Sequence, residues 1–303
     1  MAYPLKLRYF PKTALWGGNT LKSLWNKPCD FDKLAETWEL TVRPDATNLI
    51  ENGEFAGDGL DKHVEDGKFP LLIKFIDAED KLSVQVHPDD KFAAEVENDV
   101  GKTEMWYIAD AKEDAEIIYG INKDVTELLC DTGIESQVKR VKVKKGDSFF
   151  IPSGMLHAIG KGCLIAEIQQ NSDLTYRVYD YERKDANGNT RELHTEKAKK
   201  VVRYFSDAQV DAIRFSNPDK IGVGECLASC VYFNVNRITL ANSRCALETK
   251  GFFHSLLCVE GEGKISCGDQ DYYFKKGDSY YIPKEIESYE ISGTATVLIS
   301  TYN

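Results

Sequence analysis

A nine-residue motif that occurs twice constrains the fold of this chain more than any other part of the sequence. It begins at Lys144 as Lys-Lys-Gly-Asp-Ser-Phe-Phe-Ile-Pro and at Lys275, 131 residues later, as Lys-Lys-Gly-Asp-Ser-Tyr-Tyr-Ile-Pro. A match of this length marks an internal repeat. Gly-Asp predicts a turn, and the aromatic pair with isoleucine predicts the start of the next strand. We therefore expect a mainly β protein built from two copies of a short-stranded unit, each a barrel or a jelly roll.

Residues 183–222, between the two copies, differ in character from the rest of the chain. They are rich in charged side chains, and the run that starts at Thr195 has a helical pattern with Thr195 as its N-terminal cap. We therefore divide the chain into an N-terminal barrel of residues 1–182, a helical connector of residues 183–222 and a C-terminal barrel of residues 223–303. A shorter helical segment is expected around residues 125–132.

The two copies differ at one position that matters for chemistry. Five residues after the final proline of the motif, the first copy has His157 and the second has Ser288. Imidazole is the commonest metal ligand among the side chains. We therefore expect the first copy to carry a metal site, and the second to keep the fold without the ligands.

The run Leu-Ser-Val-Gln-Val-His-Pro-Asp-Asp at residues 82–90 supplies two further candidate ligands. Apolar and polar residues alternate through it, which is the pattern of a half-buried strand. Gln85 and His87 therefore point to the same face, roughly 7 Å apart along the strand. Pro88 cannot donate a backbone hydrogen bond, so we expect the strand to end just past His87.

Glu104 is the fourth candidate ligand, in a strand predicted at residues 101–108. Its neighbours on the same face of that strand include the apolar Trp106 and Ile108. A carboxylate in such surroundings needs a partner or a cation to remain ionised.

The chain has five histidines, and three of them fit structural roles better than a metal site. His63 lies in a polar loop and His194 just before the connector helix, where surface or capping roles are expected. His254 follows two phenylalanines in the second half, where other metal ligands are missing, so we expect a core or hydrogen-bonded role. His87 and His157 remain, on consecutive elements of one predicted barrel.

Two imidazole nitrogens and two oxygens make up the candidate ligand set, which is Gln85, His87, Glu104 and His157. Such a set suits Zn²⁺, and Fe, Mn, Co or Ni are alternatives. A structural zinc site usually recruits thiolates in a closed tetrahedron, whereas this set contains no cysteine. The set therefore indicates an exchangeable, catalytic position.

Composition excludes several other classes of function. The net charge of −11 argues against nucleic acid or an anionic membrane as the main partner. Eight cysteines form no Cys-x-x-Cys pair, which is typical of a reduced, cytoplasmic protein. The N-terminus lacks the basic and then apolar layout of a signal peptide, and no apolar run is long enough to span a bilayer.

Four motifs follow one another along the chain: Gln-Val-His-Pro-Asp-Asp from Gln85, Gly-Lys-Thr-Glu-Met-Trp-Tyr from Gly101, Ile-Pro-Ser-Gly-x-x-His-Ala-Ile from Ile151, and Asn-Ser-Asp-Leu-Thr-Tyr-Arg ending at Arg177. Together they closely resemble the type I mannose-6-phosphate isomerases in their short bacterial form. The resemblance covers most of the chain and is most specific for residues 70–182. The large helical insertion of the longer, eukaryotic-type members is absent, and only residues 183–215 take a comparable place.

The resemblance implies a bicupin fold, one catalytic Zn²⁺ per chain, and the reversible conversion of mannose 6-phosphate into fructose 6-phosphate. The zinc ligands of the family fall on Gln85, His87, Glu104 and His157, and its active-site arginine falls on Arg177. The implied partner is a small phosphorylated sugar. The sequence makes no prediction of the oligomeric state.

Moving a hydrogen between carbons 1 and 2 of a sugar needs a cation on the oxygens, a base beside the carbon and stabilisation of a cis-enediolate. Glu167 alternates with apolar residues in a strand predicted at residues 164–169. It is either the base or a partner that positions a ligand or a lysine. Arg177 stays charged at any working pH, so it suits the enediolate or the phosphate better than proton abstraction.

Four more residues lie on or near the same elements as the ligands. We assign Lys102 to catalysis, and Lys74 and Ser83 to substrate binding, where these three side chains hold the phosphate or relay protons. Trp16 is expected to form a wall of the pocket. Because the chain is acidic overall, phosphate recognition is expected to come from local lysines such as Lys74 and Lys102.

Two alternative functions use the same predicted fold. The first is a bicupin oxidoreductase that holds iron or manganese, but such sites usually contain three histidines and this chain offers two. The second is a non-catalytic sugar-binding or regulatory bicupin, which would need no arginine and no base around the metal.

Overall fold

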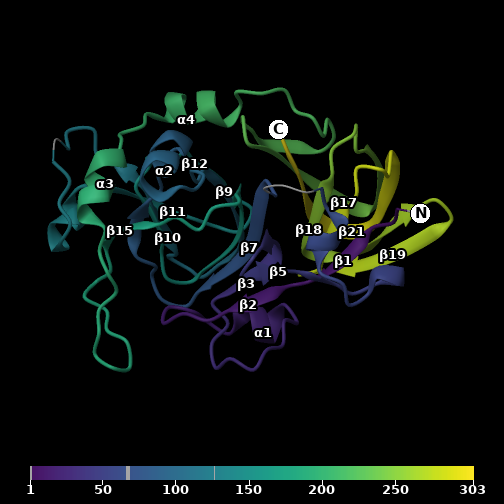
Figure 1. The fold of residues 1–303 in the computed structure, drawn as a ribbon, viewed down its shortest axis with the longest axis horizontal. Helices are drawn as coiled ribbons and strands as arrows, with labels where there is room; N and C mark the ends of the chain where they lie inside the picture. Colours follow the sequence, from purple (N-terminus) through teal and green to yellow (C-terminus); the bar gives the residue numbers. More distant parts are fainter. Residues whose placement is uncertain (1, 66–68, 126) are drawn as a thin grey trace.

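The computed structural model describes residues 2–65, 69–125 and 127–303. The chain is mainly β, as the sequence predicts. Figure 1 shows two β-rich lobes side by side, with the helices α3 (Thr195–Val201) and α4 (Asp207–Arg214) against the N-terminal lobe. Both ends of the chain lie in the C-terminal lobe. Strand β1 (Leu5–Arg8) therefore belongs to the same sheet as the last strand, β21 (Ser288–Tyr302).

Two antiparallel sheets form the N-terminal lobe. The six-stranded sheet has the order β12-β9-β14-β7-β3-β2, and the five-stranded sheet has the order β11-β10-β13-β8-β15. The strands of the first are β12 (Ser148–Ile151), β9 (Glu104–Ala111), β14 (Cys163–Gln170), β7 (Leu71–Ala78), β3 (Glu36–Leu40) and β2 (Phe10–Lys12). Those of the second are β11 (Val138–Lys142), β10 (Glu116–Ile121), β13 (His157–Ile159), β8 (Val84–Val86) and β15 (Tyr176–Tyr179). A small separate hairpin joins β4 (Val42–Arg43) to β5 (Ala46–Thr47).

One eight-stranded antiparallel sheet forms the C-terminal lobe. Its order is β16-β17-β21-β18-β20-β1-β6, and β19 pairs with the far part of β18. The strands are β16 (Glu225–Ser229), β17 (Phe233–Glu248), β21 (Ser288–Tyr302), β18 (His254–Cys267), β20 (Ser279–Ile282), β1 (Leu5–Arg8), β6 (Leu49–Ile50) and β19 (Gln270–Lys275). The two N-terminal strands in this list cross the predicted boundary at residue 182, because they complete a sheet of the other lobe.

The remaining elements are short helices. They are α1 (Thr20–Leu24), α2 (Asp90–Glu97), α3, α4 and the 3₁₀ helices Gly53–Phe55, Leu60–His63 and Thr132–Ser136. The predicted connector thus contains two helices, and α4 begins with a capping box in which Ser206 and Gln209 bond to each other's backbone. No helix in the described ranges is both long and apolar enough to cross a membrane.

Two local predictions about helices are wrong. Thr195 does not cap α3, because it is already the first helical residue, and His194 takes the cap position without a side-chain hydrogen bond. Of the helix expected at residues 125–132, Thr126 lies outside the described residues, and residues 127–131 are not helical. Asp131 instead accepts a hydrogen bond from the backbone of Gly133, which starts a 3₁₀ turn at Thr132.

Strand β7 is the centre of the N-terminal lobe, and all eight of its residues are buried. A strand covered on both faces has a continuous apolar run instead of an alternating one. Phe75 packs against Trp25 on one face, with ring centroids 4.8 Å apart. Lys74, the one lysine in the run, points to the opposite face, between the two sheets. The sheet therefore separates the hydrophobic core from a polar space that it shares with the five-stranded sheet.

The sequence repeat is also a structural repeat. Gly146 and Gly277 both have positive φ, +94° and +91°, which a residue with a side chain rarely adopts. In each copy the aspartate after this glycine accepts a hydrogen bond from the backbone N–H of the first lysine of the motif. The distances are 2.9 Å for Asp147 and 3.0 Å for Asp278. Strands β12 and β20 follow these turns, and the next strands begin at His157 and Ser288. The two halves therefore share a local geometry as well as a motif.

Two closed barrels are not confirmed. Strand pairing among the described residues leaves every sheet open, so each lobe consists of open antiparallel sheets. The lobes are also joined more closely than a connector implies, because one hydrophobic cluster runs from the six-stranded sheet into the C-terminal sheet. Ile73 and Phe75 belong to this cluster together with Phe233 and Leu298.

A buried ion pair reinforces the contact between the lobes. The ammonium of Lys27 lies 2.7 Å from Glu39 Oε1, and both side chains are at most 4% exposed. Lys27 also donates a hydrogen bond of 2.7 Å to the carbonyl of Gly277, in the turn of the second repeat. Burial raises the pKa of Glu39, and Lys27 opposes this shift by stabilising the carboxylate. Each partner therefore makes the burial of the other tolerable.

We expect Lys27→Met to lower the free energy of unfolding by about 3–5 kcal/mol, because it leaves the Glu39 carboxylate buried without a partner. Urea titration followed by tryptophan fluorescence measures this loss. The control is the double variant with Lys27→Met and Glu39→Leu, which removes both charges and should recover most of the stability. A loss below about 1 kcal/mol in the single variant would show that the pair behaves like an exposed one.

Candidate active site and metal centre

The five-stranded sheet supplies one side of the site. Gln85 is the middle residue of β8, between two buried valines, and His87 follows the last residue of the strand. Pro88 ends the strand there, and Asp89 caps α2 by accepting a hydrogen bond from Phe92 N–H. His157 starts β13 directly opposite Gln85. The strand end and the repeat therefore bring three candidate ligands together, as their spacing predicts.

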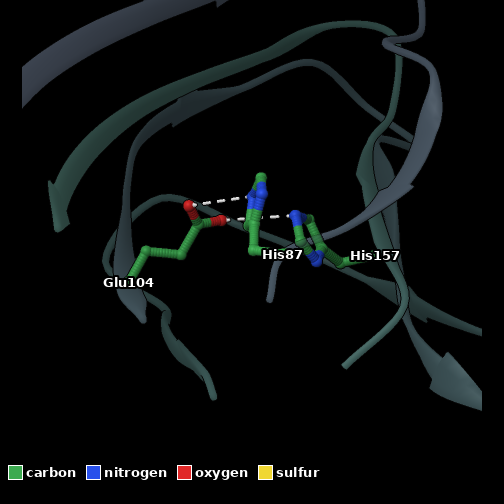
Figure 2. A group of neighbouring side chains, drawn as sticks. All are labelled: His87, Glu104 and His157. Carbon is green, nitrogen blue, oxygen red and sulfur yellow. Dashed lines mark ion pairs between the residues drawn. The ribbon is translucent and has the colours of Figure 1, made fainter. Parts of the chain in front are cut away.

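The six-stranded sheet supplies the facing carboxylate. Glu104 is the first residue of β9 and is fully buried. Its Oε2 lies 3.5 Å from His87 Nε2 and its Oε1 lies 3.4 Å from His157 Nε2. Figure 2 shows the carboxylate directed toward both imidazoles, one oxygen to each. The ligand atoms of these three residues all lie within 4.8 Å of one another.

Both imidazoles are held as neutral bases that present Nε2 to the carboxylate. Their Nδ1 atoms lie 2.7 Å from the carbonyl of Leu174 and 2.8 Å from the carbonyl of Met155. A carbonyl only accepts, so each Nδ1 carries the proton and each Nε2 has a lone pair. Burial lowers the pKa of His87 to about 3, with a further contribution from Lys102, and burial also lowers the pKa of His157.

Glu104 is a carboxylate with an incomplete set of partners. Burial alone would raise its pKa, but Lys102 and then the two histidines hold it well below its usual range. The Lys102 ammonium lies 2.7 Å from Oε2 without the alignment of a hydrogen bond. Among the described residues, neither oxygen of Glu104 has a well-aligned hydrogen-bond partner, and neither does His87 Nε2. Buried polar atoms in this state are rare unless an ion or water completes them.

These atoms fit a divalent cation. Two nitrogen lone pairs and a carboxylate converge with no donor hydrogen between the imidazoles and the carboxylate, and a cation among them would relieve their mutual repulsion beyond what the Lys102 ammonium at Glu104 Oε2 already does. The Gln85 amide adds a fourth group, with its Nε2 3.4 Å from His157 Nε2. A half-turn of that amide exchanges its nitrogen for its oxygen, which is a metal ligand. The hydrogen bonds from the two Nδ1 atoms to backbone carbonyls are also of the kind that orients histidine ligands in metal sites.

A polar cavity of about 320 Å³ adjoins this cluster. It is lined by every residue that the sequence assigned to catalysis or substrate binding, and by one of the predicted ligands: Trp16, Lys74, Ser83, Gln85, Lys102, Glu167 and Arg177. The residues predicted from the sequence therefore lie together in space. Their individual roles stay predictions.

Glu167 is one of the buried residues that line the cavity. It is opposite Lys74 in β7 and opposite Trp106 in β9. Its Oε1 lies 3.3 Å from Lys74 Nζ and 3.5 Å from Lys102 Nζ, and its Oε2 accepts a hydrogen bond of 2.9 Å from Trp106 Nε1. Lys102 also contacts Glu104, so one ammonium connects Glu167 with the candidate metal ligands.

Arg177 is directly opposite Gln85 in the pairing of β15 with β8. Its Nη1 donates a hydrogen bond of 2.8 Å to the carbonyl of Glu192, and its buried Nε has no partner in the part of the chain that the structure describes. Burial lowers its pKa, and the nearby Arg191 lowers it further. A guanidinium with free donors beside a candidate metal ligand can stabilise negative charge in the cavity.

Four further polar residues, not predicted from the sequence, line the same cavity: Glu36, Asp173, Thr175 and Arg191. Glu36 and Trp38 lie two residues apart in β3 and so point to the same face, and Trp38 Nε1 donates to Glu36 Oε2 at 2.8 Å. A charged residue at the start of a buried strand was the available signal for Glu36. Arg191 offered no signal, because it lies in a polar stretch outside any strand.

The other histidines lie apart from this cluster. His254 is buried in the C-terminal lobe, with its Nδ1 2.8 Å from the hydroxyl of Tyr289, which confirms a core role. His63 pairs with Asp58 at 3.0 Å, and His194 Nδ1 accepts a hydrogen bond from the backbone of Arg177.

Comparison with known proteins supports the resemblance over nearly the whole chain. Residues 35–123 match the model "Phosphomannose isomerase type I, catalytic domain", and residues 225–303 match "Mannose-6-phosphate isomerase, cupin domain". The chain is 37% identical to mannose-6-phosphate isomerase ManA of Bacillus subtilis over 312 residues, covering 98% of each. It is 34% identical to mannose-6-phosphate isomerase of Streptococcus mutans, covering 100% of this chain and 99% of the relative.

The chain belongs to the type I mannose-6-phosphate isomerase family. It is therefore an isomerase, and the resemblance drawn from its motifs is confirmed. The crystal structure of mannose 6-phosphate isomerase from Bacillus subtilis superposes with a TM-score of 0.84 at 33% identity, covering 99% of both chains. Phosphomannose isomerase from Salmonella typhimurium, at 14% identity and a TM-score of 0.75, shares the fold. These relatives give no support to the oxidoreductase or to the non-catalytic alternative.

For this isomerase we expect elemental analysis to find one divalent metal ion per chain. His87→Ala and His157→Ala should each lose nearly all of it, because each removes a nitrogen that the remaining groups cannot replace. His254→Ala is the matched control, since it removes a buried histidine from the other lobe and should keep the metal. Two ions per chain, or none after purification with added metal, would contradict the single site.

Proposed function

We propose that this enzyme interconverts mannose 6-phosphate and fructose 6-phosphate with one zinc ion bound by Gln85, His87, Glu104 and His157. The observation that carries the proposal is the convergence of buried acceptor atoms beside a polar cavity of the right composition for a phosphorylated sugar. The names of the relatives and of the two matching family models support the substrate.

Zinc suits this ligand set because it accepts imidazole, carboxylate and amide groups and keeps a position for exchange in catalytic sites. When bound, it would act as a Lewis acid that polarises the sugar oxygens. The chain contributes neutral histidines that need no deprotonation and a carboxylate that is already ionised, so metal binding displaces no proton from these three groups.

Three residues of the chain are proposed to move the proton and stabilise charge. Glu167 removes the proton from the carbon beside the carbonyl group, or positions Lys102, and the pathway runs through a cis-enediolate. Lys102 relays protons, because its ammonium touches both Glu104 and Glu167. Arg177, with a buried unpaired Nε next to Gln85, stabilises the negative charge that develops on the enediolate.

Substrate binding is assigned to Lys74, Ser83 and Trp16, which line the cavity around the sugar. Lys74 lies between Glu167 and Glu36, which raise its pKa against the opposing effect of burial, so it is a fully charged donor. The buried Trp16 gives the cavity an apolar wall, on which the C–H face of a sugar can pack.

We further propose a bicupin architecture with metal only in the N-terminal lobe. The repeated turn supports two units of common origin, and the C-terminal one matches a cupin domain. The units are residues 1–182 and 223–303, joined by residues 183–222, with β1 and β6 contributed to the C-terminal sheet. Ser288 takes the place of His157 in the second unit. A cytoplasmic location fits eight free cysteines and a phosphorylated substrate.

A coupled assay for fructose 6-phosphate tests the function. We expect turnover of mannose 6-phosphate by the purified enzyme, loss of turnover after chelation, and recovery on adding Zn²⁺. The control is His157→Ala, which Zn²⁺ should not restore. Absence of fructose 6-phosphate with metal-replete protein would refute the reaction, and full activity after complete metal removal would refute the zinc dependence.

Arg177→Ala separates charge stabilisation from metal binding. We expect kcat to fall on the order of 100-fold or more, by analogy with the loss of one preorganised donor, while KM changes little. Metal content and Tm should stay near those of the wild type, because a guanidinium is not a ligand. Arg203→Ala, which removes an exposed arginine, is the control. If Arg177→Ala loses metal, or raises KM at unchanged kcat, the catalytic assignment is wrong.

A further inference from the structure

Arg191 lines the active-site cavity, although it lies on none of the strands that carry the other cavity residues. It belongs to the loop of residues 180–194, between β15 and α3. In Figure 1 this loop extends below the N-terminal lobe before the chain reaches α3. Its side chain is 32% exposed, whereas the side chains of Lys74 and Lys102 in the same cavity are 6% and 5% exposed, so Arg191 is the more solvent-accessible cation.

One edge of the Arg191 guanidinium is fixed by a carboxylate. Its Nε donates to Asp180 Oδ2 at 2.8 Å and its Nη2 donates to Asp180 Oδ1 at 2.6 Å, and Asp180 itself is buried. A guanidinium has five N–H donors, of which this pair uses two. Within the described part of the chain, no acceptor bonds to Nη1. The group is therefore held in one orientation and still has an edge for another acceptor.

The base of the loop is fixed as well. Lys184 and Thr190 form a β-bridge that closes its outer part. The carbonyl of Glu192 accepts a hydrogen bond from Arg177, and the backbone N–H of His194 donates to the carbonyl of Arg177 at 2.7 Å. Arg191 thus lies on a segment that runs alongside β15 and whose position is set before any ligand arrives.

Positive charge is available to a ligand on the side of the cavity formed by β15 and the loop that follows it. Within the described residues no carboxylate lies within 4.0 Å of the Arg177 guanidinium. The proximity of Arg191 helps to lower the pKa of Arg177, after burial, because the two cations repel each other. An anion between or beside them would relieve this repulsion.

The two lysines of the cavity are in a different state. Lys74 lies within 3.6 Å of Glu36 and of Glu167, and Lys102 lies within 3.5 Å of Glu104 and of Glu167. These two ammonium groups face three carboxylates, which would repel a phosphate, whereas Arg177 and Arg191 together have one carboxylate within 4.0 Å among the described residues, which is that of Asp180. The three carboxylates around the lysines instead suit sugar hydroxyls, which donate hydrogen bonds.

We propose that Arg191 binds the phosphate group of the substrate and so determines the preference of this enzyme for a phosphorylated sugar. The inference rests on the proposed function. A hexose 6-phosphate reacts at carbons 1 and 2 and carries its phosphate at the other end of the carbon chain. Arg177 is next to Gln85 and serves the reacting end, whereas Arg191 is partly exposed to solvent and presents the planar, forked donors that match a phosphate.

Steady-state kinetics of Arg191→Gln give the first test. We expect KM for mannose 6-phosphate to rise about 10- to 100-fold, the equivalent of one or two charge-assisted hydrogen bonds, with kcat nearly unchanged. Lys184→Gln is the matched control, because it removes one exposed positive charge from the same loop outside the cavity. It should leave KM as in the wild type.

Calorimetric titration with two unreactive probes, mannitol 6-phosphate and mannitol, separates phosphate recognition from turnover. Arg191→Gln should weaken binding of mannitol 6-phosphate by the same factor and leave binding of mannitol unaltered. If both probes weaken equally, Arg191 only holds the loop, and if neither weakens, the phosphate lies elsewhere; either result overturns the inference. Wild-type enzyme that fails to turn over mannose 6-phosphate would instead refute the proposed function.

A folding defect would not block the test. Arg191→Gln leaves Asp180 buried without its partner, which can destabilise the loop. The double variant with Arg191→Gln and Asp180→Asn removes both charges and keeps hydrogen-bonding groups of similar size. The same selective loss of mannitol 6-phosphate binding is expected from it, and equal binding by this variant and the wild type would overturn the inference.

Discussion

Five charges that alternate in sign, four of them buried, hold the candidate active site together. Glu104, Lys102, Glu167, Lys74 and Glu36 follow one another in contacts of 2.7–3.6 Å on one face of the six-stranded sheet. Burying any of these ions alone is costly, so each is tolerated because its neighbours have the opposite charge. Three carboxylates against two ammonium groups leave one excess negative charge, and the end of the row is Glu104, where the two neutral imidazoles converge. A bound cation would complete the row as well as the site.

The local parts of this arrangement could be predicted from the sequence. Alternation placed Gln85 and His87 on one face, Pro88 set the end of their strand, and the repeated turn located His157. Lys74 stood out as the only charge in an apolar run before Asp77, and it is buried because β7 is covered on both faces. Each of these inferences needs only a short stretch of chain and a rule of backbone geometry.

Pairing across long distances in the sequence was beyond such rules. Nothing in residues 5–8 indicates that they pair with residues 279–281. Which strand pairs with the edge of a sheet depends on the other strands of that sheet, and the sequence of the pairing strand does not reveal them. Arg191 reaches the cavity through a loop whose course is set by Asp180, so its spacing from the other site residues has no periodic meaning. Closed barrels were expected from the motif, and the sheets are open. The motif specifies a turn and a strand, and it does not determine whether the sheet closes on itself.

The pairing of β1 with β20 has a consequence for the order of events during synthesis. Leu5 finds its partner at Tyr281, so β1 leaves the ribosome well before the strand with which it pairs. At about 5–20 residues per second the delay is on the order of tens of seconds. During that time residues 5–8 expose an unpaired strand edge, a feature prone to intermolecular pairing. The short length of this strand and its charged neighbours Lys6 and Arg8 limit that risk until the C-terminal strands arrive.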